Sequence, residues 1–142
     1  MRAVHMGEIS EERFGAGKLV LLVEDNEINA EIARLQLNEI GFEVEWAENG
    51  ARAVESFKNS EMFHYDLVVM DIMMPVMDGL EATQIIRSME RADARKIPII
   101  AVTANAYSKD AEVSAKSGVS KVITKPYSRQ ILGDAIKELL YA

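Results

Sequence analysis

The sequence predicts an α/β fold in which a five-stranded parallel sheet carries helices on both faces. Short apolar segments alternate along the chain with segments that have the helical apolar period, and the connections between them are short. This alternation favours parallel strands joined by right-handed crossovers. A chain of 142 residues is long enough to bury one core, so we expect a single domain of this class.

The middle strand is predicted from the segment that ends at Asp71. Residues Leu67 to Met70 show no polar alternation, so both faces of this segment should be buried, as in the centre of a parallel sheet. Asp71 stands where the strand stops, and Asp78-Gly79 gives a turn or helix-cap signal. From Leu80 the apolar period is helical, with one face formed by Ala82, Ile85, Ile86 and Met89.

Two strands and two helices are predicted before this segment. The apolar run Leu19 to Val23 ends in acidic residues, and Phe42 to Ala47 alternates as an outer strand would. One helix covers Glu27 to Ile40 and ends at Gly41, and a second follows Asn49-Gly50. The first of these helices has an apolar stripe formed by Ile28, Ile32, Leu35 and Ile40.

Two strands and two helices are also predicted after the middle strand. The strands are Pro98 to Val102 and Val119 to Thr124, and a helix with a thin apolar stripe is predicted over Tyr107 to Ser117. Ser128 is the predicted N-cap of a closing helix. The apolar stripe of that helix consists of Leu132, Ala135, Ile136 and Leu139.

The N-terminal segment differs from the rest of the chain. It is polar, contains three glycines and has no apolar period. We therefore expect residues 1–18 to be a flexible N-terminal linker or a remnant of cloning, and residues 19–142 to form the domain.

Composition excludes several classes of function. The net charge is −7, from 16 basic and 23 acidic residues, which disfavours nucleic acid as a direct partner. No apolar run is long enough to cross a bilayer, so we expect no membrane contact. Cysteine is absent, which excludes disulfides, thiolate metal sites and cysteine nucleophiles. These features, together with the lack of a signal-peptide pattern, favour a cytoplasmic location.

Five polar residues fall at the carboxyl ends of predicted strands, and those ends share one edge of a parallel sheet. Three of them are carboxylates, which repel one another unless a divalent cation or a lysine neutralises them. Hard oxygen ligands with no His or Cys nearby favour Mg²⁺. The five residues are Glu24, Asp25, Asp71, Thr103 and Lys125.

This set of groups suits phosphoryl transfer to an aspartate. A carboxylate oxygen attacks phosphorus while a metal ion and an ammonium group neutralise the equatorial oxygens. Asp71 is the expected nucleophile, because it alone stands on the middle strand, with acidic residues on one side and Thr103 and Lys125 on the other.

These residues resemble the receiver domain of two-component response regulators. The motifs that carry the resemblance are Glu24-Asp25, the block DIMMPVMDG around Asp71, Thr103-Ala104 and Lys125-Pro126, in a chain segment from about Leu19 to Tyr141. The stretches VEDNEIN and MDIMMPVMDGLEAT are most similar to the receivers of hybrid histidine kinases. The resemblance implies a flavodoxin-like three-layer (βα)5 fold with strand order 2-1-3-4-5.

The resemblance also implies a role for each residue of the site. Asp71 is the phosphoacceptor, and Mg²⁺ or Mn²⁺ is held by Asp25, Asp71 and the backbone carbonyl of Met73. Glu24 acts on the metal through water, Lys125 binds the phosphoryl group, and Thr103 moves to hydrogen-bond it. This movement biases the domain toward an active arrangement.

The implied partner is a histidine kinase or a histidine phosphotransfer domain, which supplies the phosphoryl group from a phosphohistidine. The expected docking surface lies near Asn26, Asn29 and Ile32 and on the loop at Pro126-Tyr127. The domain is expected to be a monomer or a weak dimer. We expect the domain alone to carry out only its own phosphorylation and dephosphorylation and not to be a turnover enzyme, and whether it is a fragment of a hybrid histidine kinase stays open.

One departure from the family and three alternatives stay open. Many receivers carry an aromatic residue three positions before the lysine, and Val122 stands there in this chain. The main alternative is a degenerate receiver that binds proteins without phosphorylation. A hydrolase with an aspartyl-phosphate intermediate usually needs an acid where Met73 stands, and a flavin protein needs a phosphate loop where Glu24 to Glu27 lie.

Overall fold

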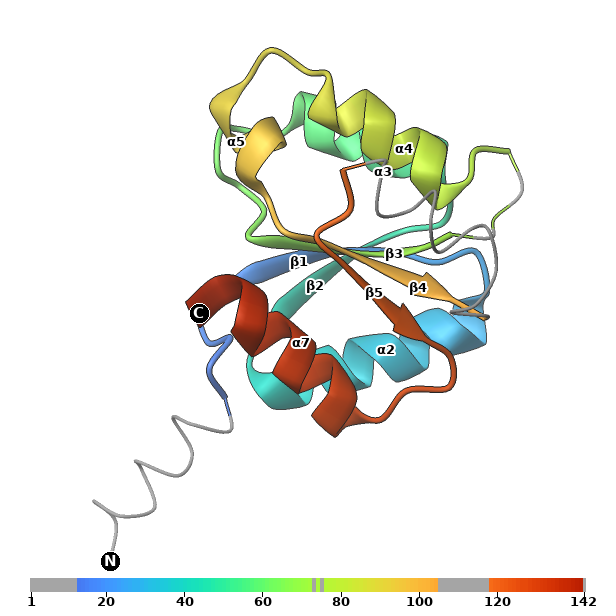
Figure 1. Cartoon of the computed structure of the whole chain (residues 1–142), viewed down its shortest axis with the longest axis vertical. Helices are drawn as coiled ribbons and strands as arrows, with labels where there is room; N and C mark the ends of the chain where they lie inside the picture. The colour runs from blue at the N-terminus through green and yellow to red at the C-terminus, as the bar shows by residue number, and fades with distance from the viewer. Residues whose placement is uncertain (1–12, 73, 75, 105–117, 142) are drawn as a thin grey trace, which may run out of the picture.

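The parallel sheet predicted from the sequence is confirmed. A computed structural model describes residues 13–72, 74, 76–104 and 118–141. Within these residues the strands form one five-stranded parallel sheet in the order β2-β1-β3-β4-β5, so the flavodoxin-like order 2-1-3-4-5 is confirmed as well (Figure 1). The strands are β1 (Leu19–Val23), β2 (Glu43–Ala47), β3 (Leu67–Asp71), β4 (Ile99–Thr103) and β5 (Lys121–Thr124).

Helices cover both faces of the sheet (Figure 1). One face carries α2 (Glu27–Ile40) and α7 (Arg129–Tyr141). The other carries α3 (Gly50–Asn59), α4 (Gly79–Arg87) and the short α5 (Ala92–Lys96), which has no counterpart in the sequence prediction. The helix predicted over Tyr107 to Ser117 lies entirely outside the described residues.

The strands divide their side chains between two hydrophobic clusters because successive residues of a strand face opposite sides. In β1, Val20 and Leu22 belong to the cluster under α2 and α7, while Leu21 and Val23 belong to the cluster on the other face. All five residues of β3 are buried, as expected for the middle strand. Asp71 is therefore held at the end of a fully buried strand.

The helix boundaries follow local capping. Asp78 accepts a hydrogen bond from the Glu81 backbone N–H at 2.8 Å, and Ser128 Oγ accepts one from Ile131 N–H at 3.1 Å, so both side chains cap helices as the sequence indicated. Gly41 ends α2 with a φ of 114°, a left-handed value that favours glycine.

The apolar stripe of α2 does not face the sheet along its length. Ile28, Ile32 and Leu35 are 72%, 53% and 51% exposed. The helix instead buries Ala30, Ala33, Leu37 and Ile40, and of the expected stripe only Ile40 lies in the core. Small alanine side chains let the helix pack closely on the sheet and leave three large apolar residues in solvent.

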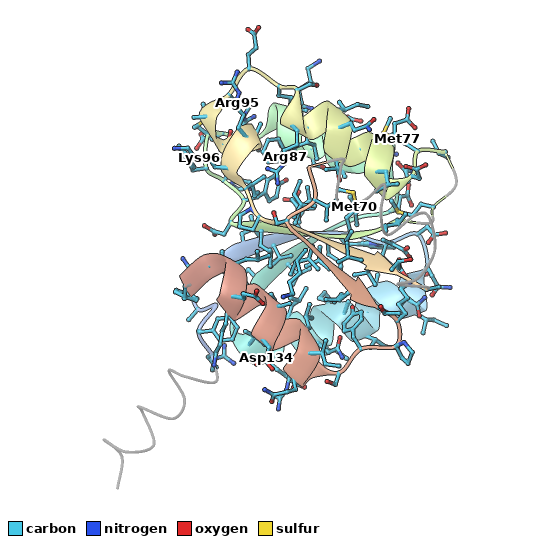
Figure 2. The ribbon with its side chains drawn as sticks, in the orientation of Figure 1. Met70, Met77, Arg87, Arg95, Lys96 and Asp134 are labelled. Atoms are coloured by element: carbon cyan, nitrogen blue, oxygen red, sulfur yellow. The ribbon has the colours of Figure 1, made fainter. Side chains whose placement is uncertain are left out.

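Arg87 ties α4 to the start of β5. Its side chain lies between the helical layer and the sheet, as Figure 2 shows. The guanidinium donates to the carbonyls of Gly118 at 2.9 Å and Ala94 at 3.0 Å. Burial lowers the pKa of Arg87. These bonds fix the edge strand β5, from which Lys125 follows.

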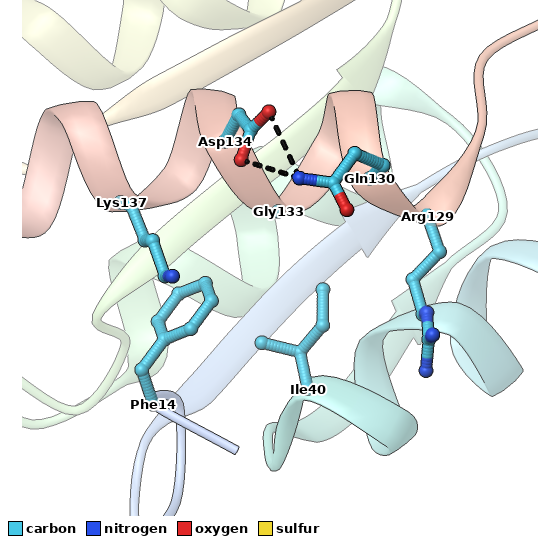
Figure 3. A pocket seen from close by; sticks show the side chains of 7 residues that line it. All are labelled: Phe14, Ile40, Arg129, Gln130, Gly133, Asp134 and Lys137. Atoms are coloured by element: carbon cyan, nitrogen blue, oxygen red, sulfur yellow. Dashed lines mark hydrogen bonds between the residues drawn. The ribbon is translucent and has the colours of Figure 1, made fainter. Parts of the chain in front are cut away.

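Arg13 to Lys18 pack against the domain. The ring of Phe14 meets Phe42 and Tyr141 edge to face, with centroids 6.3 Å and 5.9 Å apart, and the Tyr141 hydroxyl donates to the Phe14 carbonyl at 2.7 Å. Figure 3 shows Phe14 beside Lys137 at the rim of a cavity of about 230 Å³ along α7.

The domain boundary at residues 18 and 19 stays a prediction. None of the helices in the described parts of the chain is long and apolar enough to cross a membrane.

A charged clamp joins the end of α3 to the start of α5. Arg91 binds both carboxylate oxygens of Asp93 at 2.8 Å, donates to the Phe57 carbonyl at 2.9 Å and lies over the Phe57 ring. The backbone N–H of Phe63 also donates to Asp93, at 2.8 Å. Hydrogen bonding from Arg91, opposed by burial, lowers the pKa of Asp93. The carboxylate side chain is 4% exposed, so the clamp is almost closed to solvent.

Asp93→Asn is expected to lower the free energy of unfolding by about 1.5–3 kcal/mol at neutral pH, the usual effect of losing hydrogen bonds to a charged group. Because folding lowers the pKa of Asp93, its stabilisation is fully present above about pH 4 and is lost as the pH falls through the lowered value. Urea unfolding at pH 7, 5 and 3 measures this difference. A gap between parent and variant that does not shrink toward pH 3 would contradict the assignment.

Candidate functional site

The carboxyl edge of the sheet brings three acidic side chains together. Glu24 follows β1 and Asp71 ends β3, and these residues are 4% and 8% exposed, while Asp25 is exposed. One carboxylate oxygen from each of the three lies within 4.8 Å of the other two. The sheet produces this cluster because β1 and β3 are neighbours and both end at this edge.

Lys125 reaches into the acidic cluster from the loop after β5. Its Nζ lies 2.8 Å from Asp71 Oδ2 and 3.5 Å from Glu24 Oε1. The Lys125 backbone N–H donates to the Thr103 carbonyl at 2.7 Å, which joins the loop to the end of β4. Burial lowers the pKa of Lys125, but the hydrogen bond and charge of Asp71, together with Glu24, outweigh it, and the pKa is raised overall.

The Glu24 carboxyl has a strongly shifted pKa. Burial is the main cause, and the adjacent Asp71 carboxylate adds to it, so the pKa of Glu24 is raised to about 7. The charge of Lys125 and the side chain of Asn29 offset part of this rise. Two carboxylates in contact with one ammonium group leave excess negative charge, which favours a bound cation.

Thr103 ends β4 at the same edge and is buried. The register pairs Asp71 with Val102 and Thr103 with Thr124, so Thr103 lies one position further along than the acid. Val122 is half-buried on β5 and pairs with Ala101. The backbone carbonyl of Met73, the fourth expected metal ligand, lies outside the described residues.

Trp46 supports the site in a way that sequence reasoning missed. Its indole N–H donates to the backbone carbonyl of Glu24 at 2.7 Å and so ties the end of β2 to the acidic loop. An aromatic residue near the end of an outer strand was the only available signal. Asn29 and Tyr127 were considered as docking residues, but they also line a small cavity beneath Glu24.

The donor set fits a hard divalent cation. The three nearest ligand groups are all carboxylates, and neither His nor Cys contributes to the cluster among the described residues. Mg²⁺ prefers such oxygen ligands and keeps several waters, so it needs only one or two of these groups in direct contact. The residues are therefore chemically suited to hold it.

Comparison with known proteins identifies the family. The family model of the response regulator receiver domain matches residues 20–137. The chain is 40% identical over 119 residues to hybrid signal transduction histidine kinase I of Dictyostelium discoideum, which covers 82% of this chain and 7% of that protein. It is 43% identical over 116 residues to two-component system protein A of Emericella nidulans, covering 81% of this chain and 16% of that protein. The chain thus spans a small part of each of these relatives.

A solved receiver domain has the same fold. The receiver domain of sensor histidine kinase PA1611 from Pseudomonas aeruginosa PAO1 superposes with a TM-score of 0.80 and 35% identity, covering 89% of this chain and all of that one. That protein was crystallised with a magnesium ion coordinated in its active site cleft. By sequence and by fold, the chain belongs to the response regulator receiver domain family and is a receiver of two-component phosphorelays, related to those of hybrid histidine kinases.

Proposed function

We propose that Asp71 accepts a phosphoryl group from a phosphohistidine. The observation that carries this proposal is the contact of Lys125 Nζ with Asp71 Oδ2 at 2.8 Å, inside a cluster where Glu24 and Asp25 also lie. In the reaction an Asp71 oxygen forms a bond to phosphorus while the bond between phosphorus and the imidazole nitrogen breaks. The nitrogen keeps the electron pair and, with a proton on the other ring nitrogen of the donor histidine, the side chain leaves as neutral imidazole.

The residues of this chain hold and neutralise the incoming group. Asp25, Asp71 and the Met73 carbonyl are the proposed ligands of Mg²⁺, with Mn²⁺ as a substitute, and Glu24 is proposed to act through water. When bound, the metal ion supplies positive charge to the phosphoryl oxygens. Lys125 moves from the carboxylate of Asp71 to a phosphoryl oxygen, and Thr103 hydrogen-bonds another, which links phosphorylation to the position of β4.

The proposed donor is a histidine kinase or a histidine phosphotransfer domain that docks on α2. Ile28, Ile32 and Leu35 are large apolar residues at positions i, i+4 and i+7, and all three are exposed. The same helix begins beside Glu24 and Asp25, so a partner on this surface places its histidine near Asp71. We propose that the receiver works within or beside a larger kinase, as a monomer or a weak dimer that does not contact nucleic acid directly.

Intact mass after incubation with acetyl phosphate tests the function. The parent protein should gain about one phosphoryl group in the presence of Mg²⁺ and none after chelation, and Asp71→Asn should gain none under either condition. Asp78→Asn is the matched control, because this cap lies close in sequence and should leave uptake intact. Uptake by Asp71→Asn would contradict the assignment. If the parent gains nothing from acetyl phosphate or from a phosphorylated transfer domain, the chain is a receiver that binds without phosphorylation.

Trp46 should report metal binding directly, since it is the only tryptophan in the chain and its indole bonds to the Glu24 carbonyl. Titration with Mg²⁺ is expected to change the emission intensity of the parent protein with a saturable dependence. Asp25→Asn should shift the midpoint to at least about tenfold higher Mg²⁺, because a ligand and a negative charge are lost. An equal midpoint in both proteins would place the metal elsewhere.

A further inference from the structure

A small cavity lies beneath the acidic edge, between α2 and the sheet. Its volume is about 30 Å³. A buried water needs roughly 10–15 Å³ measured in this way, so the cavity has room for one or two waters and for no larger ligand. Apolar cavities of this kind stay dry, whereas polar ones are usually hydrated. The polar residues that line this cavity are Glu24, Asn29, Asp71, Lys125 and Tyr127.

Glu24 provides a second and independent observation. Its side chain is 6% exposed, and Oε1 lies 3.5 Å from Lys125 Nζ. The other oxygen, Oε2, is buried and has no hydrogen-bond partner among the described residues. Buried polar atoms in folded proteins almost always bond to protein or to ordered water, so this carboxylate oxygen requires a donor. The cavity that Glu24 lines is large enough to supply one.

We propose that the cavity is a water-binding site in which one ordered water donates a hydrogen bond to Glu24 Oε2 and is held on its other side by the Asn29 side chain. Asn29 is thereby a positioning residue for the acidic edge. Asn29 and Glu24 line the same small cavity, so one water can contact both side chains. The water completes two to three hydrogen bonds, the usual number at a buried site.

The water fixes the orientation of Glu24 before a phosphoryl donor arrives. With Oε2 turned to the water, Oε1 is directed to Lys125 and cannot rotate away without losing a hydrogen bond. This inference deepens the proposed function, because the role of the oriented carboxylate rests on Asp71 as phosphoacceptor. The water site itself depends only on the cavity and on the buried oxygen.

Ala33 and Ala30 provide a matched pair of variants. Both lie on α2 and are 5% exposed in the same hydrophobic cluster, but only Ala33 lines the cavity. High-resolution crystal structures of the metal-free and Mg²⁺-loaded parent should show a water within hydrogen-bond distance of Glu24 Oε2. Ala33→Val should remove this water by filling its space, and Ala30→Val should keep it. If Ala33→Val does not fold, Ala33→Ser should also remove it, since its hydroxyl replaces the water.

The role of Asn29 is tested by the lifetime of the water. Magnetic relaxation dispersion of water oxygen-17 should show a long-lived water in the parent and at least a tenfold shorter residence time in Asn29→Ala. An unchanged residence time, a dry cavity in the parent or a water retained in Ala33→Val would each overturn the proposal. Phosphoryl uptake is measured separately. If the cavity holds an ordered water but the protein takes up no phosphoryl group, only the proposed function is contradicted. If the protein takes up a phosphoryl group but the cavity is dry, only this inference is contradicted.

Discussion

Lys125→Met is expected to bind Mg²⁺ about tenfold more tightly than the parent protein and to take up phosphoryl groups roughly 10²–10³-fold more slowly. The two effects have opposite signs because two roles are proposed for Lys125. Before phosphorylation its ammonium group neutralises Asp71 and Glu24, at 2.8 Å and 3.5 Å, and so competes with a cation for the same negative charge. During transfer the same group should stabilise the charge that develops on the phosphoryl oxygens. Methionine preserves the length of the side chain and removes the charge.

Lys121→Met is the control for this variant. Lys121 lies on the same strand, β5, but its ammonium group pairs with Glu138 on the surface, away from the acidic edge. Lys121→Met should alter neither the affinity for Mg²⁺ nor the rate of phosphoryl uptake. Isothermal titration gives the affinity, and intact mass against time gives the rate. Weaker Mg²⁺ binding by Lys125→Met would show that the lysine supports the metal site and does not compete with it.

Gly79→Ala is expected to destabilise the protein by about 1–3 kcal/mol or more, the range found for overpacked sites. A Cβ at Gly79 would lie 2.4 Å from the carbonyl oxygen of Asp71 and 3.1 Å from the Ile72 Cα. These are backbone atoms, so either α4 or the end of β3 must move. Displacement of Asp71 by even 1 Å should also slow phosphoryl uptake, by roughly 10²-fold.

Gly133→Ala should have the opposite effect on stability. Gly133 lies inside α7, where an added Cβ meets only Ile40 Cδ1 at 3.8 Å, an ordinary contact. Alanine favours a helix interior by about 0.5–1 kcal/mol over glycine, so this variant should be more stable than the parent. Urea unfolding of both variants measures the contrast. Equal stabilities for Gly79→Ala and the parent would contradict the close approach of α4 to β3.

The sequence predicted which side chains meet at this edge of the sheet because their positions depend on strand ends. Once Leu67 to Met70 are recognised as a buried strand, the position of Asp71 follows from topology, and Lys125 follows in the same way from the last strand. The contact between these two side chains is then required by the shared edge. The position of Thr103 was predicted for the same reason, whereas its role in switching rests on the family.

Sequence periodicity predicted the wrong buried face for α2, because this helix has two apolar faces. On α2, Ile28, Ile32 and Leu35 have the spacing of a core stripe, yet they lie in solvent, and Ala33 and Leu37 face the sheet. Residue size decides this, because alanine permits closer packing than isoleucine, and periodicity alone does not measure size. The short helix α5 was missed because five residues carry too little of a helical period.

The contact of Phe14 with Tyr141 places both ends of the folded unit at one corner. Because β1 starts there and α7 ends there, this corner is at the amino edge of the sheet, across the molecule from the carboxyl end of β3 (Figure 1). Neighbouring domains joined at either end would therefore attach at the amino edge of the sheet. The carboxyl edge, where Asp71 lies, would stay accessible to the histidine of a donor domain. A domain with this geometry can therefore be inserted into a longer signalling protein without blocking access to Asp71.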